Sequence, residues 1–221
     1  MYTHTVSTKT LATLKQLLGD EKLLGFILVG GTALALQIGH RMSVDIDLFA
    51  TKEFDKPALS KYLTLKYGFR LPVYSDVAIR GFIDNLKTDL MYYETGFLRE
   101  PIVVDGIRMA GIEDIAVMKL EAIANVHNRA KDYVDIAFLS EHLSLEKMLS
   151  GFKEKFGQDE TLALRSLNVF SEVKDIKDVF LMKGEFEWDK IKKRIVEMTN
   201  NPSKIFSPMK MTPLRAGGKG L

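Results

Sequence analysis

The first half of the chain alternates short apolar runs with amphipathic segments, a pattern typical of strands packed against helices. The apolar run Phe26–Val29 predicts a buried strand, closed by two glycines. Leucines at helical spacing predict a helix over Leu11–Leu24, and a second helix is predicted over Lys56–Tyr67, ending near Gly68.

Two hairpins are predicted next. The runs Val73–Ile83 and Leu86–Tyr93 are rich in β-branched and aromatic residues, and Asp84-Asn85 between them is a tight-turn signal. Asp105-Gly106 lies in the same way between two shorter apolar runs. Both pairs favour the positive φ angles of a two-residue hairpin turn.

From Ile112 onward the pattern changes to long helical periodicity. The predicted helices are Ile112–Asn128, Arg129–His142, Leu145–Phe156, Thr161–Val169 and Trp188–Met198. We therefore predict an α+β fold, with a mixed sheet and its helices followed by a C-terminal helical region. We expect residues 1–110 to form the α/β core, 111–200 the helical region, and 201–221, rich in proline and without periodicity, a mobile tail.

The amino-acid composition narrows the class of protein to which this chain can belong. The chain has 221 residues, 46% of them hydrophobic, which is enough for a sizeable core. The absence of cysteine excludes disulfides, thiolate metal sites and a cysteine nucleophile. The net charge is +2, and residues 201–221 hold four basic and no acidic side chains, so the basicity belongs to the tail. With no signal core and no run of about 18 apolar residues, we expect a soluble cytoplasmic protein without membrane contact.

The glycine pair Gly30-Gly31 is the first candidate for chemistry. Glycine lets the backbone approach a ligand closely and adopt positive φ. Thr32 is predicted to be the N-cap of a helix over Ala33–His40, whose free N–H groups would favour an anion. A glycine pair alone is more commonly only a turn.

Asp45 and Asp47 follow on the next predicted strand, two residues apart and so on one face. Such a pair is commonly only a solvated strand face. Two carboxylates roughly 6 Å apart, however, repel by about 3 kcal/mol at an effective dielectric near 20. A bound cation would offset that repulsion, so the ordered string of glycine turn, helix and Asp-x-Asp predicts a site for a metal-bound phosphate.

Asp89, on the predicted strand Leu86–Tyr93, is the candidate third carboxylate. Lys87 lies two residues away on the same face, so a solvent-facing aspartate is the alternative. Asp84 is the second choice, but it fits a hairpin turn better.

Lys119 lies in the otherwise apolar stretch from Ile115 to Leu120, where its amine must either reach solvent or meet an anion. Asp132 and Asp135, three residues apart on the next predicted helix, share one helix face. Either is a candidate partner of Lys119.

The early motif resembles that of the nucleotidyltransferase superfamily and, more closely, of the AbiEii toxins of type IV toxin–antitoxin systems. The residues that carry this resemblance are Gly30-Gly31-Thr32-Ala33-Leu34-Ala35-Leu36, Gly39-His40-Arg41, Ser43 and Asp45-Ile46-Asp47-Leu48-Phe49. The later residues Met118–Ile123, Arg129 and Lys131–Ile136 resemble the lysine helix and the Lys/Arg-Asp-x-x-Asp helix of that family. Thr32 stands where many superfamily members have serine, and it keeps the hydroxyl.

The resemblance implies the reaction and the roles of the residues. Asp45, Asp47 and Asp89 would hold Mg²⁺ (or Mn²⁺) and would be catalytic together with Lys119 and Asp132. The nucleoside triphosphate would be bound by Gly30, Gly31, Thr32, Arg41, Ser43 and Lys119. The acceptor would be RNA such as a tRNA 3′ end, and a cognate antitoxin would be a partner. The helical region would complete the active site.

Two other functions remain open at this stage. A related enzyme that adenylylates a small molecule such as an antibiotic would use the same carboxylates. A non-catalytic nucleotide-binding or partner-binding protein would keep only the fold. The cluster Lys190–Arg194 would fit RNA, although a solvated helix face is the commoner reason for such charges.

Overall fold

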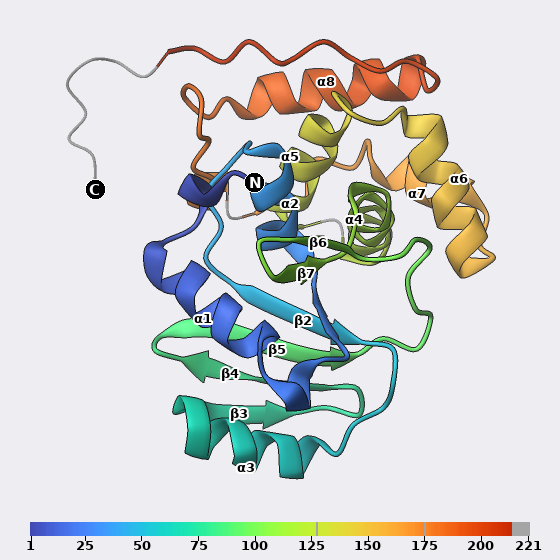
Figure 1. Cartoon of the computed structure of the whole chain (residues 1–221). Coiled ribbons are helices and arrows are strands. Elements are labelled where there is room, and N and C mark those ends of the chain that lie inside the picture. Colours follow the sequence, from blue (N-terminus) through green and yellow to red (C-terminus); the bar gives the residue numbers. More distant parts are fainter. Residues whose placement is uncertain (127, 175, 214–221) are drawn as a thin grey trace. The chain divides into compact units, whose positions relative to one another are not determined.

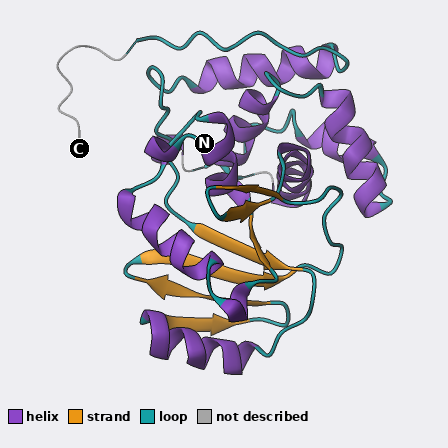
Figure 2. Cartoon of the chain, in the orientation of Figure 1, coloured by secondary structure: helices purple, strands orange, loops and turns teal. Residues whose placement is uncertain are grey.

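The computed structural model describes residues 1–126, 128–174 and 176–213. The chain divides into two units, each with its own interior. The first comprises Met1–Ile38 and Ser43–Gly111, and the second comprises Gly39–Met42 and Ile112–Leu221. Strands gather in the first unit, whereas the second is built from helices and loops (Figure 2).

A mixed sheet organises the first unit, with the strand order β3-β4-β5-β2-β1-β7-β6 (Figure 1). The strands are β1 (Phe26–Leu28), β2 (Ile46–Ala50), β3 (Arg70–Tyr74), β4 (Ala78–Ile83), β5 (Leu86–Tyr92), β6 (Ile102–Val104) and β7 (Ile107–Met109). The pairs β2/β5 and β1/β7 are parallel and the other pairs are antiparallel. The predicted α+β class with a mixed sheet is confirmed.

Both predicted hairpins are present. Asp84 and Asn85 have φ angles of 51° and 67°, and Asp105 and Gly106 have 50° and 79°, as a two-residue turn between twisted strands requires. The single strand predicted over Val73–Ile83 was wrong. A turn separates β3 from β4, where the Ser75 N–H donates to the Ala78 carbonyl and the Ala78 N–H donates to the Ser75 hydroxyl.

Three helices accompany the sheet: α1 (Thr8–Leu18), α2 (Gly30–Ile38) and α3 (Lys56–Tyr67). α1 contacts β7, α2 contacts β2, and α3 contacts β3 and β4. The helix predicted over Leu11–Leu24 ends at Leu18, because Asp20 caps a separate short helical turn, accepting from the Lys22 N–H. α3 has its predicted bounds and ends at Gly68, which has φ +65°.

The second unit contains α4 (Ile112–Val126), α5 (Ala130–Leu139), α6 (Leu145–Phe156), α7 (Glu160–Ser166) and α8 (Trp188–Asn200). α4 packs against α5, α6 and α7, and α8 packs against α5. Gly39–Met42 joins this unit through backbone hydrogen bonds, from Met42 N–H to the Phe180 carbonyl (2.8 Å) and from Met182 N–H to the His40 carbonyl (3.0 Å). Within the described residues, every helix is too short or too polar to cross a membrane.

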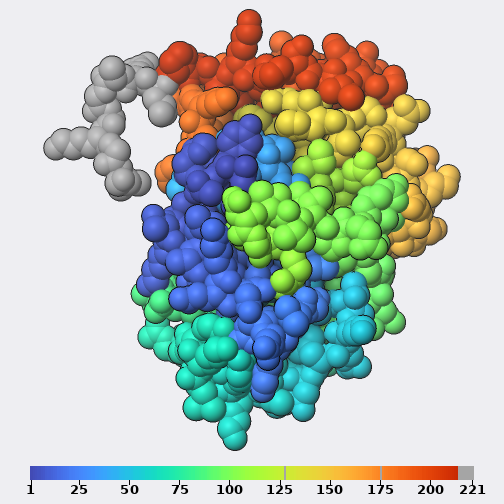
Figure 3. Space-filling view, viewed as in Figure 1, coloured from blue at the N-terminus to red at the C-terminus, as the bar shows by residue number. Residues whose placement is uncertain are grey.

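The segment after α8 is extended and lies against the second unit. The Phe206 N–H donates to the Ser140 carbonyl, and the Met209 N–H donates to the Glu141 carboxylate. In the space-filling view, the segment from α8 onward forms a continuous surface strip at the red end of the colour scale (Figure 3). The mobile tail predicted for 201–221 thus has defined contacts over 201–213, and its remainder, 214–221, lies outside the described residues.

Candidate active site

Gly30 lies at the junction between β1 and α2, with φ +69°. A Cβ atom at this position would lie 2.7 Å from Asp47 Oδ2, closer than a side-chain carbon is found to another group. The backbone angle therefore favours glycine here, and a larger residue would also displace the Asp47 carboxylate. The first N–H groups of α2 begin at this turn, an arrangement that favours an anion.

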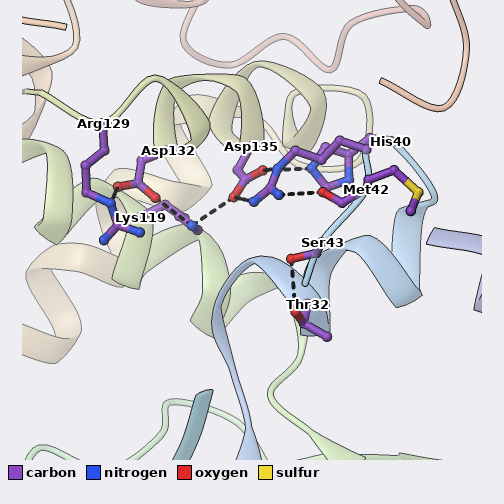
Figure 4. Close-up of polar contacts among 9 residues, drawn as sticks. Thr32, His40, Met42, Ser43, Lys119, Arg129, Asp132 and Asp135 are labelled. Carbon is purple, nitrogen blue, oxygen red and sulfur yellow. Dashed lines mark hydrogen bonds and ion pairs between the residues drawn. The ribbon is translucent and has the colours of Figure 1, made fainter. Parts of the chain in front are cut away.

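Thr32 does not cap the helix, which corrects the prediction. α2 begins at Gly30, so Thr32 lies within its first turn and is 1% exposed. Its hydroxyl donates to the Asp45 carbonyl. The same hydroxyl lies 2.9 Å from the Ser43 hydroxyl (Figure 4). The Val29 N–H also donates to the Asp47 carbonyl at 2.9 Å. These bonds fix the glycine turn against the segment that carries both aspartates.

Asp47 and Asp89 are register partners on the parallel strands β2 and β5. Ile46 and Leu48 are fully buried on one side of β2, and Asp47, half-buried, lies on the other. Asp45 directly precedes the strand and is also half-buried. The sheet thus brings Asp89 beside the Asp-x-Asp segment. Asp84, the second choice, lies in the hairpin turn and pairs with Lys9 at 3.8 Å.

Two cations accompany Asp89, which is 8% exposed. Lys87 Nζ lies 3.0 Å and Arg80 Nε 3.6 Å from Asp89 Oδ2. Partial burial lowers the pKa of Lys87, but the hydrogen bond to Asp89 and the charges of Asp89, Asp47 and Asp45 outweigh it and raise that pKa. Asp89 Oδ1 is buried and has no hydrogen-bond partner among the described residues.

The carboxylates of Asp47 and Asp89 fit a metal ion whose remaining ligands come from the substrate. Within the described part of the chain, no group of three or more His, Cys, Asp or Glu side chains is arranged to hold a metal by itself. Mg²⁺, however, is commonly bound by one or two carboxylates together with substrate phosphates. The register pair Asp47 and Asp89, with an unpartnered oxygen on Asp89, supplies that number of ligands.

A second polar cluster lies inside the second unit, centred on Asp135, which is fully buried (Figure 4). Arg41 Nε and Nη2 donate to its two oxygens at 2.6 and 2.9 Å, and His40 Nε2 donates at 2.7 Å. Arg41 and Lys119 outweigh the effect of burial and hold the pKa of Asp135 well below its usual value. Arg41 itself is 3% exposed.

Lys119 lies between both candidate carboxylates. Its Nζ is 2.6 Å from Asp132 Oδ1 and 2.8 Å from Asp135 Oδ2. Burial lowers the pKa of Lys119, but the charges of Asp132 and Asp135 raise it above its usual value. Arg129 Nε approaches the other Asp132 oxygen at 3.3 Å from a largely exposed position. Arg41 and Lys119 thus balance the two buried carboxylates.

Sequence reasoning missed Lys87 and His40 as members of these clusters. The signal for Lys87 was present, because it is two residues from Asp89 on one strand face. The sequence contained no signal for His40, since its partner Asp135 is 95 residues away in the chain. Burial lowers the pKa of His40, and its Nδ1 is buried with no hydrogen-bond partner among the described residues.

Part of the charge of the basic cluster Lys190–Arg194 on α8 is balanced by neighbouring acidic side chains. Lys190 pairs with Glu187 at 2.7 Å, and Lys192 pairs with Asp189 at 2.6 Å. Arg194 donates to the Ser140 hydroxyl at 2.9 Å. The two ion pairs neutralise two of the four positive charges of this cluster.

Comparisons with known proteins identify one relative in sequence and several proteins with a similar fold. The chain is 32% identical to the uncharacterized protein aq_aa25 of Aquifex aeolicus (strain VF5) over 160 residues, which cover 68% of this chain and 76% of that protein. JHP933 from Helicobacter pylori has a similar fold, with a TM-score of 0.51 and 19% identity over 88% of this chain and 92% of that one. A crystallised nucleotidyltransferase candidate from Helicobacter pylori also has a similar fold, with a TM-score of 0.50. It is 19% identical, over 88% of this chain and 94% of that one.

The family comparison covers most of the chain. Residues 13–70 and 81–204 match the family described as "Nucleotidyl transferase AbiEii toxin, Type IV TA system". The matched ranges include the glycine turn, Asp45, Asp47, Asp89 and the lysine–aspartate cluster. This protein is a nucleotidyltransferase and belongs to the AbiEii toxin family.

Proposed function

We propose that this protein transfers a nucleoside monophosphate from a metal-bound nucleoside triphosphate to RNA, at a tRNA 3′ end, and acts as a toxin with a cognate antitoxin. The observation that carries the catalytic part is the register pair Asp47 and Asp89, with Gly30 against the Asp47 carboxylate. The RNA acceptor and the antitoxin rest on membership of the family.

Asp45, Asp47 and Asp89 would hold Mg²⁺ or Mn²⁺. When bound, such a metal neutralises charge on the phosphate oxygens and orients the triphosphate. The backbone of Gly30 and Gly31, at the start of α2, offers N–H groups to phosphate oxygens. Thr32 and Ser43 stabilise this turn through their hydroxyls. They would support nucleotide binding by keeping the glycine turn in its observed conformation.

The reaction requires one bond to form and one to break at the α-phosphorus. The acceptor hydroxyl oxygen attacks that phosphorus in line, the bond to the oxygen that bridges the α- and β-phosphates breaks, and pyrophosphate leaves. The hydroxyl proton passes to a carboxylate. Asp89 has two alternative roles: if Asp45 and Asp47 alone hold the metal, Asp89 Oδ1, which has no hydrogen-bond partner among the described residues, accepts this proton.

Lys119 and Asp132 belong to the proposed machinery through the second family motif. Asp132 and Asp135 together keep the Lys119 amine charged and fixed in position. We expect Lys119 and Arg41 to stabilise negative charge on the triphosphate during transfer.

The test is a labelled-nucleotide transfer assay. Purified protein is incubated with Mg²⁺ and each α-³²P nucleoside triphosphate, and separately with total tRNA, aminoglycosides or protein extract. Labelled tRNA with released pyrophosphate is expected, while a γ label stays untransferred. Asp47→Asn should abolish transfer, and Asp76→Asn, an exposed loop aspartate of the same unit, should not.

Two results would contradict the proposal. Label on an aminoglycoside and none on tRNA would identify a small-molecule enzyme. Transfer of the γ label, or transfer unchanged in Asp47→Asn, would remove the assigned carboxylates from the chemistry.

A further inference from the structure

Lys87 is the nearer of the two cations that pair with Asp89. Its Nζ hydrogen-bonds Asp89 Oδ2 at 3.0 Å, and the charges of Asp47 and Asp45 act on it as well. Arg80, the cross-strand partner of Asp89 on β4, is farther away at 3.6 Å.

The two ends of this ion pair differ in exposure. The Asp89 side chain is 11% exposed and held in the sheet, whereas the Lys87 side chain is 48% exposed. The lysine end is therefore the one free to swing into solvent. Half-exposed ion pairs of this kind contribute little to stability, so breaking one costs little.

Two neighbouring carboxylates without a cation repel each other, and Asp47 and Asp89 are adjacent register partners on β2 and β5. A lysine ammonium offsets part of this repulsion. A divalent cation carries twice the charge and would contact both carboxylates, so it would displace the ammonium and repel it.

We propose that Lys87 is a built-in counter-ion of the carboxylate site, bound to Asp89 in the metal-free protein and displaced when a divalent metal binds. The inference rests on the proposed metal role of Asp47 and Asp89. Lys87 then acts as a positioning residue that keeps metal affinity low until a triphosphate supplies further ligands.

Binding of Mn²⁺ alone, without nucleotide, tests the proposal. Free Mn²⁺ is measured by its EPR signal during titration of the full chain, and melting curves check that each variant is folded. Lys87→Gln should bind Mn²⁺ roughly threefold to fivefold more tightly than the parent, the factor that corresponds to losing one half-exposed ion pair. Lys87→Arg keeps the charge and should stay within about twofold of the parent.

The matched control is Lys61→Gln, an exposed lysine on α3 in the same unit with no ion pair among the described residues. It should leave Mn²⁺ affinity unchanged. Mn²⁺ binding by Lys87→Gln that is equal to or weaker than that of the parent would overturn the inference. Weaker binding would show that Lys87 favours metal binding.

Asp47→Asn separates failure of this inference from failure of the proposed function. If the parent binds Mn²⁺ and Asp47→Asn does not, the metal site stands and Lys87→Gln decides the inference alone. If neither the parent nor Lys87→Gln shows binding that depends on Asp47, the metal assignment is overturned and this inference with it.

Discussion

Asp47 on β2 and Asp89 on β5 face each other as register partners on two parallel strands. Neighbouring strands lie about 4.8 Å apart, so the pairing of β2 with β5 keeps the two aspartates next to each other. Ile46, Leu48 and Leu90, nearly or fully buried, fix this register, because a slip by one residue would turn them toward the opposite side of the sheet.

The carboxylate pair predicts a stability response to metal and nucleotide. Mg²⁺ with a nucleoside triphosphate should raise the melting temperature of the parent, because a bound ligand stabilises the folded state. Asp45→Ala and Asp47→Ala should lose that increment and keep a parental melting temperature without ligand, since each removes a like-charge neighbour. Differential scanning fluorimetry measures both, with Asp76→Ala as the control. A parental increment in Asp47→Ala would contradict the assignment.

Gly30→Ala should impair the site more than the fold. A residue other than glycine in the left-handed region costs about 1 kcal/mol or more, and the new methyl group would also displace the Asp47 carboxylate. Gly68→Ala is the matched control, because Gly68 also has a positive φ, +65°, but no atom lies within 4 Å of its added Cβ. Both should lose stability in urea unfolding. Only Gly30→Ala should lose the response to metal and nucleotide. An equal response in both variants would contradict the assignment of the Gly30 turn to the site.

Lys119→Met should lower the free energy of unfolding by about 3 kcal/mol or more, because it leaves Asp132 and Asp135 buried without their shared cation. Adding Asp132→Asn should recover part of the loss, since Asp135 keeps Arg41. Urea unfolding measures all three proteins. Lys193→Met, on an exposed position of α8, should stay within about 0.5 kcal/mol of the parent. A loss no larger than that control would show that the buried pair is not needed for stability.

His40 predicts a loss of stability in mild acid. Burial lowers its pKa below the ordinary 6.5 while Asp135, Arg41 and Lys119 face it, so below about pH 6.5 the unfolded chain binds a proton that the folded chain does not. Stability should therefore fall from pH 7.5 to 5.5, by at most about 1.4 kcal/mol per pH unit from this group. The pKa of Asp135 lies below 3.8, so its contribution is lost only at still lower pH.

Urea unfolding at pH 7.5, 6.5 and 5.5 measures that slope. His40→Gln should flatten it, and His142→Gln, an exposed position in the same unit, should not. Equal slopes in the parent and His40→Gln would mean that His40 takes up its proton equally in both states.

Local features of this protein could be predicted from the sequence because short-range physics decides them. Asp84-Asn85 and Asp105-Gly106 tolerate positive φ and so determine the hairpins. The bounds of α3 and α6 follow from helical periodicity together with Gly68 and Gly157, which end the helices in the left-handed conformation. The glycine turn and the Asp-x-Asp segment lie close in the chain, so their order alone was enough to predict a site for a metal-bound phosphate there.

The partners of the charged residues were decided by the tertiary structure. Threonine favours the N-cap position, but the Thr32 hydroxyl bonds to Ser43 and to the Asp45 carbonyl instead. The helix begins at Gly30, three residues before its predicted start at Ala33. Arg41 and Asp135 are 94 residues apart, and no local period relates them. They meet because a charge removed from water must find an opposite charge, and only the packed chain determines which one is within reach.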